Sequence, residues 1–183
     1  ASHQHLATGF TIGTRFHSAP VIRVADARPM QLGHAVRADG RWRLFVFAPK
    51  EDPAKPVSVI RALCDFLANA ANSPIKKYTP AGMDIDAVID VRAVFQQRHQ
   101  DISVDTLPFL LLPCKGRLGL QDYEKVFSPD LKGGRDIFTM RGIDREQGCV
   151  VIVRPDQFVA HVLPLDGHAE LAAYFDAFML APA

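Results

Sequence analysis

Cysteine is scarce in this sequence, and the few cysteines that occur lie far apart. The 183 residues contain three of them, Cys64, Cys114 and Cys149. A secreted disulfide framework needs an even number of closely spaced cysteines, so this usage favours a reducing compartment and predicts a cytoplasmic protein. No C-x-x-C motif occurs, so the sequence lacks the paired thiols of disulfide oxidoreductases.

Long apolar runs and clusters of like charge are also lacking. The longest apolar run, LPFLLLP at 107–113, has only the length of a strand, which predicts no membrane association. Residues 1–20 have no apolar centre and do not read as a signal peptide. The formal net charge is +1 and the pI is near 8.0, which argues against a nucleic-acid binder, because such proteins carry a clustered basic surface.

Motifs for nucleotide, metal and acyl chemistry are missing as well. No G-x-G-x-x-G, G-x-x-x-x-G-K-[ST] or G-x-S-x-G is present, so the chain shows no flavin, nicotinamide or elbow-type nucleophile site of its own. His3 and His5 form an H-x-H pair, but without a third ligand we interpret them as part of a flexible terminus. We therefore predict no cofactor and no metal in this chain.

The sequence does contain enough hydrophobic residues, 48%, for the core of one large domain. Residues 1–18 have no periodicity and are expected to be extended at the surface. Asp39-Gly40 predicts a tight β-hairpin between residues 31–38 and 41–48. The second of these strands becomes wholly apolar from Leu44 onward, which indicates a central strand.

A helix and a second strand follow. Apolar residues recur at helical spacing from Val57 to Ala68, and Asn72-Ser73-Pro74 is expected to end that helix. AVIDVRAVF, residues 87–95, alternates in the manner of a half-buried strand, with Asp90 and Arg92 on its polar side.

The middle of the chain is less regular. LPFLLLP fits either a short buried strand or a helical turn between prolines. LQDYEKVFS, residues 120–128, favours a short helix, and LKGGRD, residues 131–136, favours a loop because its paired glycines have no periodicity.

The end of the chain gives the clearest pattern. VVIVRPDQFVAHVLP, residues 150–164, predicts a β-hairpin with Pro155 and Asp156 at the central positions of its turn. An apolar stripe from Leu171 to Met179 predicts a final helix, capped by Asp166 or Gly167. The order of elements predicts an α/β thioredoxin-like fold: a mixed central sheet flanked by helices, ending in a hairpin and a helix. The Asp39-Gly40 hairpin would add an edge, as in peroxiredoxin-like variants.

In such a fold a reactive cysteine would stand at the start of the first helix, where the helix N-terminus lowers the pKa of a thiol. The corresponding stretch, APKEDPAKP at 48–56, has no cysteine. Cys64 falls in the middle of the helix on its apolar face, and Cys149 precedes a β-run. Both are expected to be packing residues, so redox catalysis is disfavoured.

Two clusters of charged residues remain as candidate sites. The candidate docking or structural residues are Arg141, Asp144, Arg145, Arg154 and Asp156. Turn capping and salt bridges are the favoured interpretation, because turn chemistry alone explains an aspartate at a hairpin corner. The alternative is a docking surface, where the planar arginine group binds carboxylates. His161 is expected to share a strand face with Val159 and Leu163 as a structural residue.

Two long stretches, residues 3–48 and 141–179, resemble the C-terminal domain of phenol hydroxylase-type flavoprotein monooxygenases. That group includes phenol 2-monooxygenase and bacterial 3-hydroxybenzoate 4-monooxygenase. The most specific segments are ADGRWR at 38–43 and RGIDR followed by VVIVRPDQFVAHVLPLD. The resemblance extends over nearly the whole chain and is weaker between Asn72 and Gly134.

The resemblance implies a single thioredoxin-like domain over residues 1–183, without redox cysteines and without catalytic, cofactor-binding or metal-binding residues. Its role would be dimerisation in an enzyme that uses FAD and NADPH to insert one atom of O2 into a phenolic ring. Residues 1–18 would then be a linker from the catalytic FAD and substrate domains. Those domains and a second copy in a homodimer would be the partners. The start at Ala-Ser without methionine fits an excised domain.

Two alternatives stay open. One is a divergent thioredoxin- or peroxiredoxin-like redox protein that uses Cys64, Cys114 or Cys149. The other is a small-ligand binding module with a pocket near Trp42, although a lone tryptophan in a central strand is ordinarily part of the core.

Overall fold

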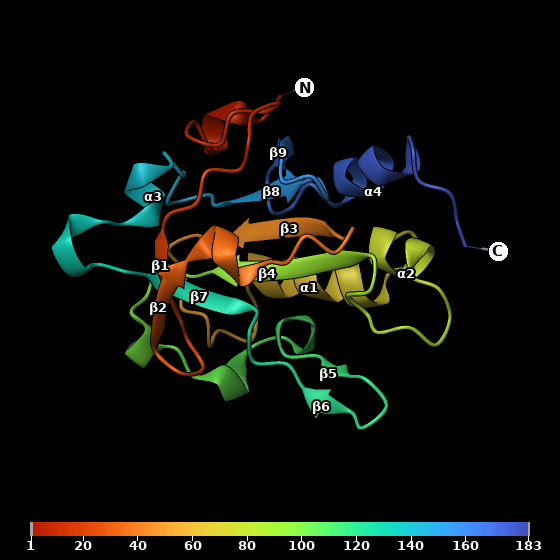
Figure 1. The fold of residues 1–183 in the computed structure, drawn as a ribbon, viewed down its shortest axis with the longest axis horizontal. Coiled ribbons are helices and arrows are strands. Elements are labelled where there is room, and N and C mark those ends of the chain that lie inside the picture. Colours follow the sequence, from red (N-terminus) through yellow and green to blue (C-terminus); the bar gives the residue numbers. More distant parts are fainter. Residues whose placement is uncertain (1, 183) are drawn as a thin grey trace.

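A seven-stranded mixed sheet runs through the centre of the computed structural model, which describes residues 2–182 (Figure 1). In spatial order its strands are β2 (Arg28–Gln31), β1 (Pro20–Arg23), β7 (Val126–Pro129), β4 (Ile89–Val94), β3 (Trp42–Phe47), β8 (Cys149–Val153) and β9 (Val159–Leu163). β3, β4 and β7 are parallel to one another, and every other neighbouring pair is antiparallel. The helix-connected β3–β4 pair and the β8–β9 hairpin form the predicted thioredoxin-like core.

Helices cover one face of this sheet. They are α1 (Val59–Asn69), α2 (Pro74–Tyr78) and α4 (His168–Asp176), and their apolar residues share one core cluster with the sheet. α1 begins where the Ser58 hydroxyl accepts a hydrogen bond from the Arg61 N–H, and it buries the stripe that includes Leu63 and Leu67. Gly167 is the N-cap of α4, one of the two residues expected there.

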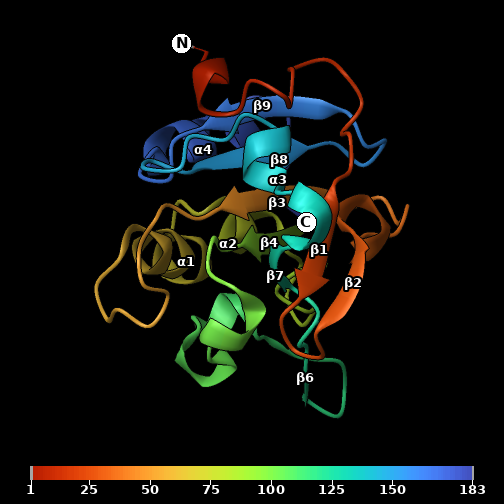
Figure 2. The ribbon, with the colours of Figure 1, turned by 90° about the vertical axis from the view of Figure 1, so that its left-hand side faces the viewer.

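A second core cluster fills the opposite face of the sheet. Here α3 (Ile137–Met140) and the chain before β1 pack against Phe45, Phe47 and Val151. Figure 2 shows the N-terminal segment crossing the molecule beside β9 before it enters β1. The sheet is therefore buried on both faces, which explains why β3 and β8 are almost entirely apolar.

Short elements complete the chain. A two-stranded hairpin of β5 (Cys114–Lys115) and β6 (Leu120–Gln121) projects from the body (Figure 1). Single turns of 3-10 helix occur at Gln4–Leu6, Leu32–Ala35, His99–Asp101, Val104–Thr106, Phe109–Leu111 and Lys132–Gly134. LPFLLLP therefore contains a helical turn, the second of its two predicted conformations. No helix within residues 2–182 is long and apolar enough to cross a membrane.

The Asp39-Gly40 hairpin is a wrong prediction. β3 pairs with β4 and β8, while the chain before Asp39 forms a 3-10 turn at Leu32–Ala35. Gly40 does adopt a positive φ of 80°, so the chain bends there. The bend does not start a hairpin because β3 has two apolar faces and takes the centre of the sheet. The hairpin that adds the extra edge is β1–β2.

Three smaller expectations in the first two thirds of the chain are also corrected. Residues 120–128 do not form a helix, because Val126–Pro129 pairs with both β4 and β1 as β7. Asn72-Ser73-Pro74 does not only end a helix, since Ser73 and Pro74 start α2 as N-cap and first residue. β4 is buried on both faces, because its two charged residues are paired inside the protein.

Residues 2–18 run over the surface as predicted for residues 1–18, but part of the segment is buried. Leu6 and Phe10 are fully buried in the second core cluster. The Gly13 N–H donates to the Val159 carbonyl over 2.8 Å, which ties the segment to the edge of β9. A role for this segment as a linker from preceding domains stays a prediction.

Candidate functional site

The place where a thioredoxin-like enzyme would carry its reactive thiol is occupied by backbone and amide contacts. This stretch lies between β3 and α1. The Gln96 side-chain amide donates to the Ala48 carbonyl over 3.0 Å and to the Arg145 carbonyl over 2.7 Å. The Lys50 N–H also donates to the Arg145 carbonyl over 2.9 Å. These bonds tie the stretch to neighbouring loops.

Two of the three cysteines are buried away from this place. Burial raises the pKa of Cys64 to about 12, and it also raises the pKa of Cys149 far above the ordinary thiol value. Both groups stay protonated near neutral pH, so neither supplies a thiolate nucleophile. Cys114 is exposed at the start of β5.

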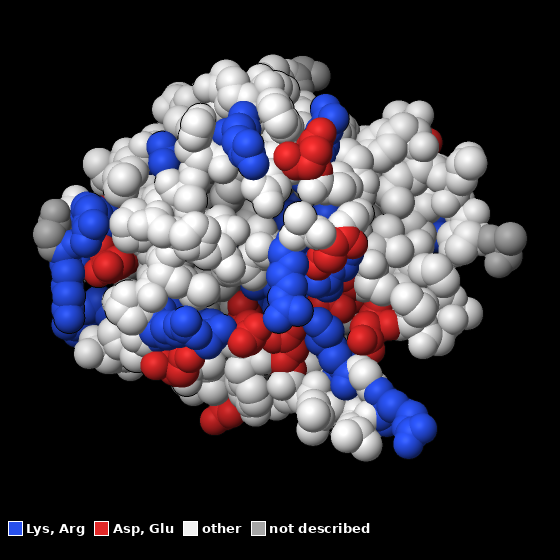
Figure 3. Space-filling view, in the orientation of Figure 1, with Lys and Arg blue, Asp and Glu red and all other residues white. Residues whose placement is uncertain are grey.

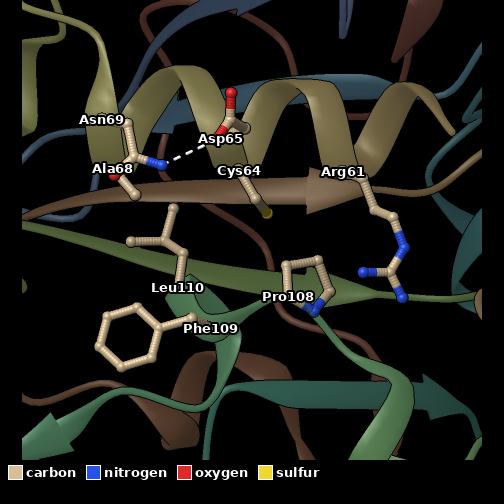
Figure 4. Close-up of a pocket in the computed structure, with 8 residues that line it drawn as sticks. All are labelled: Arg61, Cys64, Asp65, Ala68, Asn69, Pro108, Phe109 and Leu110. Carbon is tan, nitrogen blue, oxygen red and sulfur yellow. Dashed lines mark hydrogen bonds between the residues drawn. The ribbon is translucent and has the colours of Figure 1, made fainter. Parts of the chain in front are cut away.

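A cavity of about 380 Å³ lies beside Cys64, between α1 and the turn Phe109–Leu111. Figure 4 shows the Cys64 sulfur directed toward that turn, with Arg61 and Asp65 on either side of it along α1. Of the charged groups that line the cavity, Asp65 is exposed and Arg61 is half-buried; the charge of Arg61 acts to lower the pKa of Cys64, but burial outweighs it and raises that pKa. The neighbourhood therefore does not activate the thiol.

Arg141 is an internal brace. Its guanidinium donates to the Ser18 carbonyl and lies over the Phe10 ring, with 5.8 Å between Cζ and the ring centroid. Gly9 fits against the Arg141 backbone, where an added Cβ would come within 2.7 Å of the Arg141 Cα. Arg141 thus holds the N-terminal segment on the second core cluster.

Asp144 and Arg145 also bond within the chain. The Asp144 carboxylate accepts the Glu146 and Gln147 N–H groups, both over 2.9 Å, and these backbone bonds hold its pKa below the usual range. The Arg145 guanidinium pairs with Asp136, the N-cap of α3. The contacts of Arg141, Asp144 and Arg145 thus hold the loops around α3 in place.

Arg154 and Asp156 form the predicted corner of the β8–β9 hairpin. The Gln157 N–H donates to the Arg154 carbonyl over 2.9 Å, so Pro155 and Asp156 are the central residues of the turn, as predicted. Arg154 Nη2 donates to Asp156 Oδ2 over 2.6 Å, and the two side chains keep 52% and 49% of their exposure. Unlike Arg145, which pairs with the N-cap of α3, these two side chains pair with each other across the turn that they form.

A group of aromatic rings surrounds the hairpin corner and α4. Trp42, Tyr174 and Phe178 contact one another, with centroid separations of 5.1 Å for Trp42–Phe178 and 5.4 Å for Tyr174–Phe178. Arg154 lies over the Phe158 ring at 6.0 Å from its centroid. Aromatic neighbours thus occupy the space around Trp42, where the sequence allowed a small-ligand pocket.

His161 has a structural contact of a different kind from the one expected. It stacks on Tyr174 at 5.4 Å, on the same side of the sheet as Leu163. Val159 faces the opposite core cluster because the register of β9 shifts by one residue at a bulge. Burial lowers the pKa of His161, which favours its neutral form.

A buried ionic cluster, which was not predicted from the sequence, lies at the start of the parallel strands. Its members are Arg43, Asp86, Asp90, Arg92 and Lys125. Lys125 Nζ lies 2.5 Å from Asp90 Oδ1 and 2.6 Å from Asp86 Oδ2. The only available signal was the alternation in β4, which placed Asp90 and Arg92 together but suggested a solvent face.

Asp90 stands at the centre of this cluster, with no exposed side-chain surface. Its second oxygen lies 2.9 Å from Arg92 Nε and 3.0 Å from Arg43 Nε. Burial alone would raise the pKa of Asp90, but the cations around it outweigh burial and lower that pKa. For Asp86 the same balance gives a pKa of about 2. These carboxylates are charged partners and do not act as proton carriers near neutral pH.

Lys115, Arg41, Asp39 and Asp122 extend the cluster outward to the surface. Figure 3 shows this charged region on the central and lower part of the molecule. Each cation in it has an acidic partner within the chain, so the region carries its own compensation. Within residues 2–182, no three His, Cys, Asp or Glu side chains come together to hold a metal ion. His3 lies 3.1 Å from Glu170 of α4.

Comparisons with known proteins agree with this picture. The family model described as "Phenol hydroxylase, C-terminal dimerisation domain" matches residues 1–183. A 3-hydroxybenzoate 4-monooxygenase of Comamonas testosteroni is 62% identical over 182 residues, and an FAD-dependent monooxygenase of Aspergillus terreus is 33% identical over 181 residues. These alignments cover 99% and 97% of this chain but only 28% and 29% of the relatives.

Solved structures support the fold alone. The thioredoxin domain of a thiol-disulfide oxidoreductase from Bacteroides vulgatus superimposes with a TM-score of 0.53 at 12% identity. The superposition covers 93% of this chain and 99% of that domain, which confirms the thioredoxin-like fold. On its full-length family match and its 62% identical relative, the chain belongs to the family of phenol hydroxylase C-terminal dimerisation domains.

Proposed function

We propose that this chain is the non-catalytic dimerisation domain of an enzyme that uses FAD and NADPH to hydroxylate a phenol or a hydroxybenzoate. The relatives support this assignment, because their names describe monooxygenases and the chain spans less than a third of their length. The other domains of the parent enzyme would hold FAD and the aromatic substrate. This chain would contact those domains and would join two copies of the enzyme.

One observation carries the non-catalytic part of the proposal. The stretch between β3 and α1, where the fold would place a reactive thiol, is tied to neighbouring loops by Gln96 and Lys50. Cys64, on the following helix, is buried with its pKa raised to about 12. These two observations support a thioredoxin-like scaffold whose usual thiol position does not supply a thiolate.

Deletion of this domain from the parent enzyme tests the dimerisation role. We expect light scattering to give the mass of two subunits for the full-length enzyme and of one subunit for the truncated enzyme. Flavin absorbance of the truncated enzyme should persist, because the FAD site lies elsewhere. A truncated enzyme that remains a dimer would contradict the proposal.

Thiol chemistry tests the redox alternative. The chain should show no turnover of peroxide or of a disulfide substrate, and titration should find Cys114 reacting before Cys64 and Cys149 because it alone is exposed. Serine variants at each position serve as controls. Rapid turnover that is lost in one of these variants would favour a redox enzyme instead.

A further inference from the structure

The aromatic rings near α4 and the hairpin corner form a surface with the composition of a binding hot spot. We define the aromatic–arginine surface as Trp42, Arg154, Phe158, Tyr174 and Phe178. Tryptophan, tyrosine and arginine are the residue types that dominate binding energy at protein interfaces. Phe178 keeps 47% of its exposure and Phe158 keeps 38%, although both rings contact other members of the surface.

The members of this surface are already held in place. Phe178 lies between Trp42 and Tyr174, and the three rings contact one another across β3 and α4. Arg154 is close enough to Tyr174 for its charge to lower the pKa of that hydroxyl, although burial dominates and raises it. Side chains that are ordered before binding lose little conformational entropy when a partner arrives.

Charge around the surface is sparse and balanced. Figure 3 shows that the part of the molecule over α4 and the C-terminal segment exposes few charged side chains in this view. At the hairpin corner Arg154 and Asp156 are paired over 2.6 Å and are both about half exposed, and on α4 Glu170 is paired with His3. When two copies pack around a twofold axis, each residue of a patch can meet its complement on the other copy. Arg154 of each copy can then pair with Asp156 of the other.

The β5–β6 hairpin offers a different exposed apolar group. Leu118 and Leu120 are largely exposed, but the glycines around them, Gly116 and Gly119, have φ values of 68° and 61°. Lys115 of β5 is already paired within the chain, with Asp86 and Asp122. This hairpin therefore lacks the packed rings and the exposed ion pair of the aromatic–arginine surface.

We infer that the aromatic–arginine surface is the dimer contact, and that its occupant is the same surface of a second copy of this chain. This inference rests on the proposed dimerisation function and names the side chains that carry it. Phe178 would be the central contact, while Arg154 and Asp156 would exchange their partner within the chain for one across the interface.

The test measures the dimer dissociation constant of the full-length enzyme by sedimentation equilibrium. Phe178→Glu should raise that constant at least about 30-fold, the effect of losing a hot-spot residue. Arg154→Asp should weaken the dimer through repulsion of two acidic corners, and the double variant Arg154→Asp/Asp156→Arg should restore it. Leu118→Glu is the matched control and should leave the constant unchanged.

Melting curves of each variant show whether it is folded. If Phe178→Glu unfolds, Arg154→Asp and the double variant still test the surface, because their side chains are exposed. If deletion of the domain gives a monomer while folded Phe178→Glu and Arg154→Asp dimerise like the unmodified enzyme, this surface is wrong and the proposed function stands. A weakened dimer in Leu118→Glu would also overturn the surface, by pointing to the β5–β6 hairpin. If deletion leaves a dimer, the proposed function itself fails.

Discussion

The molecule uses aspartate and basic residues in two ways, and the two places differ mainly in their access to water. In the buried ionic cluster, Asp90 has no exposed surface and contacts Lys125, Arg92 and Arg43. At the hairpin corner, Arg154 and Asp156 pair at a similar distance but remain about half exposed.

The difference in access to water decides what each pair can do. Buried charges have lost their hydration, so removal of one partner leaves the others uncompensated. Exposed charges keep most of their hydration and contribute little to stability, so they can exchange one partner for another at small cost. The cluster is thus suited to fixing the fold, and the corner pair is suited to a contact between molecules.

Asp90→Asn should have the largest effect on this comparison. The substitution keeps the shape of the side chain but leaves three cations around a neutral group, so we expect a loss of about 3–5 kcal/mol in the free energy of unfolding. Urea denaturation of the chain measures it. Asp101→Asn, in an exposed pair with Arg98, is the control and should change stability by less than about 0.5 kcal/mol. Equal effects at the two sites would mean that water reaches the cluster.

Low pH should have the next largest effect, because it protonates the aspartates of the buried ionic cluster and lowers the free energy of unfolding. The pKa of Asp86 lies near 2 and that of Asp90 is also lowered, whereas an unfolded aspartate titrates near about 4. Their stabilisation is therefore fully present above about pH 4 and is lost as the pH falls toward about 2. The urea midpoint of unfolding should fall between about pH 4 and about pH 2, and the midpoint of the Asp86→Asn variant should fall less steeply. A midpoint independent of pH in this window would contradict the lowered pKa values.

Arg141→Ala should have an intermediate effect. The variant loses the bond to the Ser18 carbonyl and the packing over Phe10, which we expect to cost about 1–2 kcal/mol. For a chain of this size the melting temperature would fall by roughly 2–8 °C. Arg154→Ala is the comparison, and its fall should be much smaller. The reverse order would show that Arg141 does not anchor the N-terminal segment.

Asp156→Ala should have the smallest effect on the isolated chain. It removes an exposed ion pair and a 3.3 Å bond from the Phe158 N–H, so we expect a loss of about 0.5 kcal/mol and a slightly lower melting temperature. Asp156→Asn retains an acceptor for that N–H, so its melting temperature should fall less. An unchanged melting temperature in Asp156→Ala would favour a docking role for Asp156 over a structural role in the turn.

Local patterns were sufficient for the parts of the fold that depend on local chemistry. The β8–β9 hairpin follows from Pro155 and Asp156 at a turn between two apolar runs, and α4 follows from its apolar stripe and Gly167. The absence of C-x-x-C distinguishes this sequence from disulfide oxidoreductases that carry that motif.

Long-range pairing explains the errors. Val126 and Phe127 have helical spacing with Tyr123, but the open edges of β4 and β1 recruit them into β7. Asp90 and Arg92 alternate like solvent-facing residues, yet Lys125, directly before β7, pairs with Asp90 inside the protein. No local pattern could reveal Lys125 as their partner, since it lies more than 30 residues further along the chain. The candidate residues 141–145 and 154–156 could not be told apart either, because the contact of Arg141 with Ser18 joins residues far apart in the sequence.

The packing of the first residues against the last ones affects how the protein folds. His3 contacts Glu170 across a separation of 167 residues, and Gly13 bonds to Val159. A chain emerging from the ribosome therefore cannot complete the packing of Leu6 and Phe10 until β9 has been made. Closing such long loops slows folding, and the exposed apolar residues are open to misassembly in the meantime. The core of this domain is consequently completed only after β9 has been synthesised.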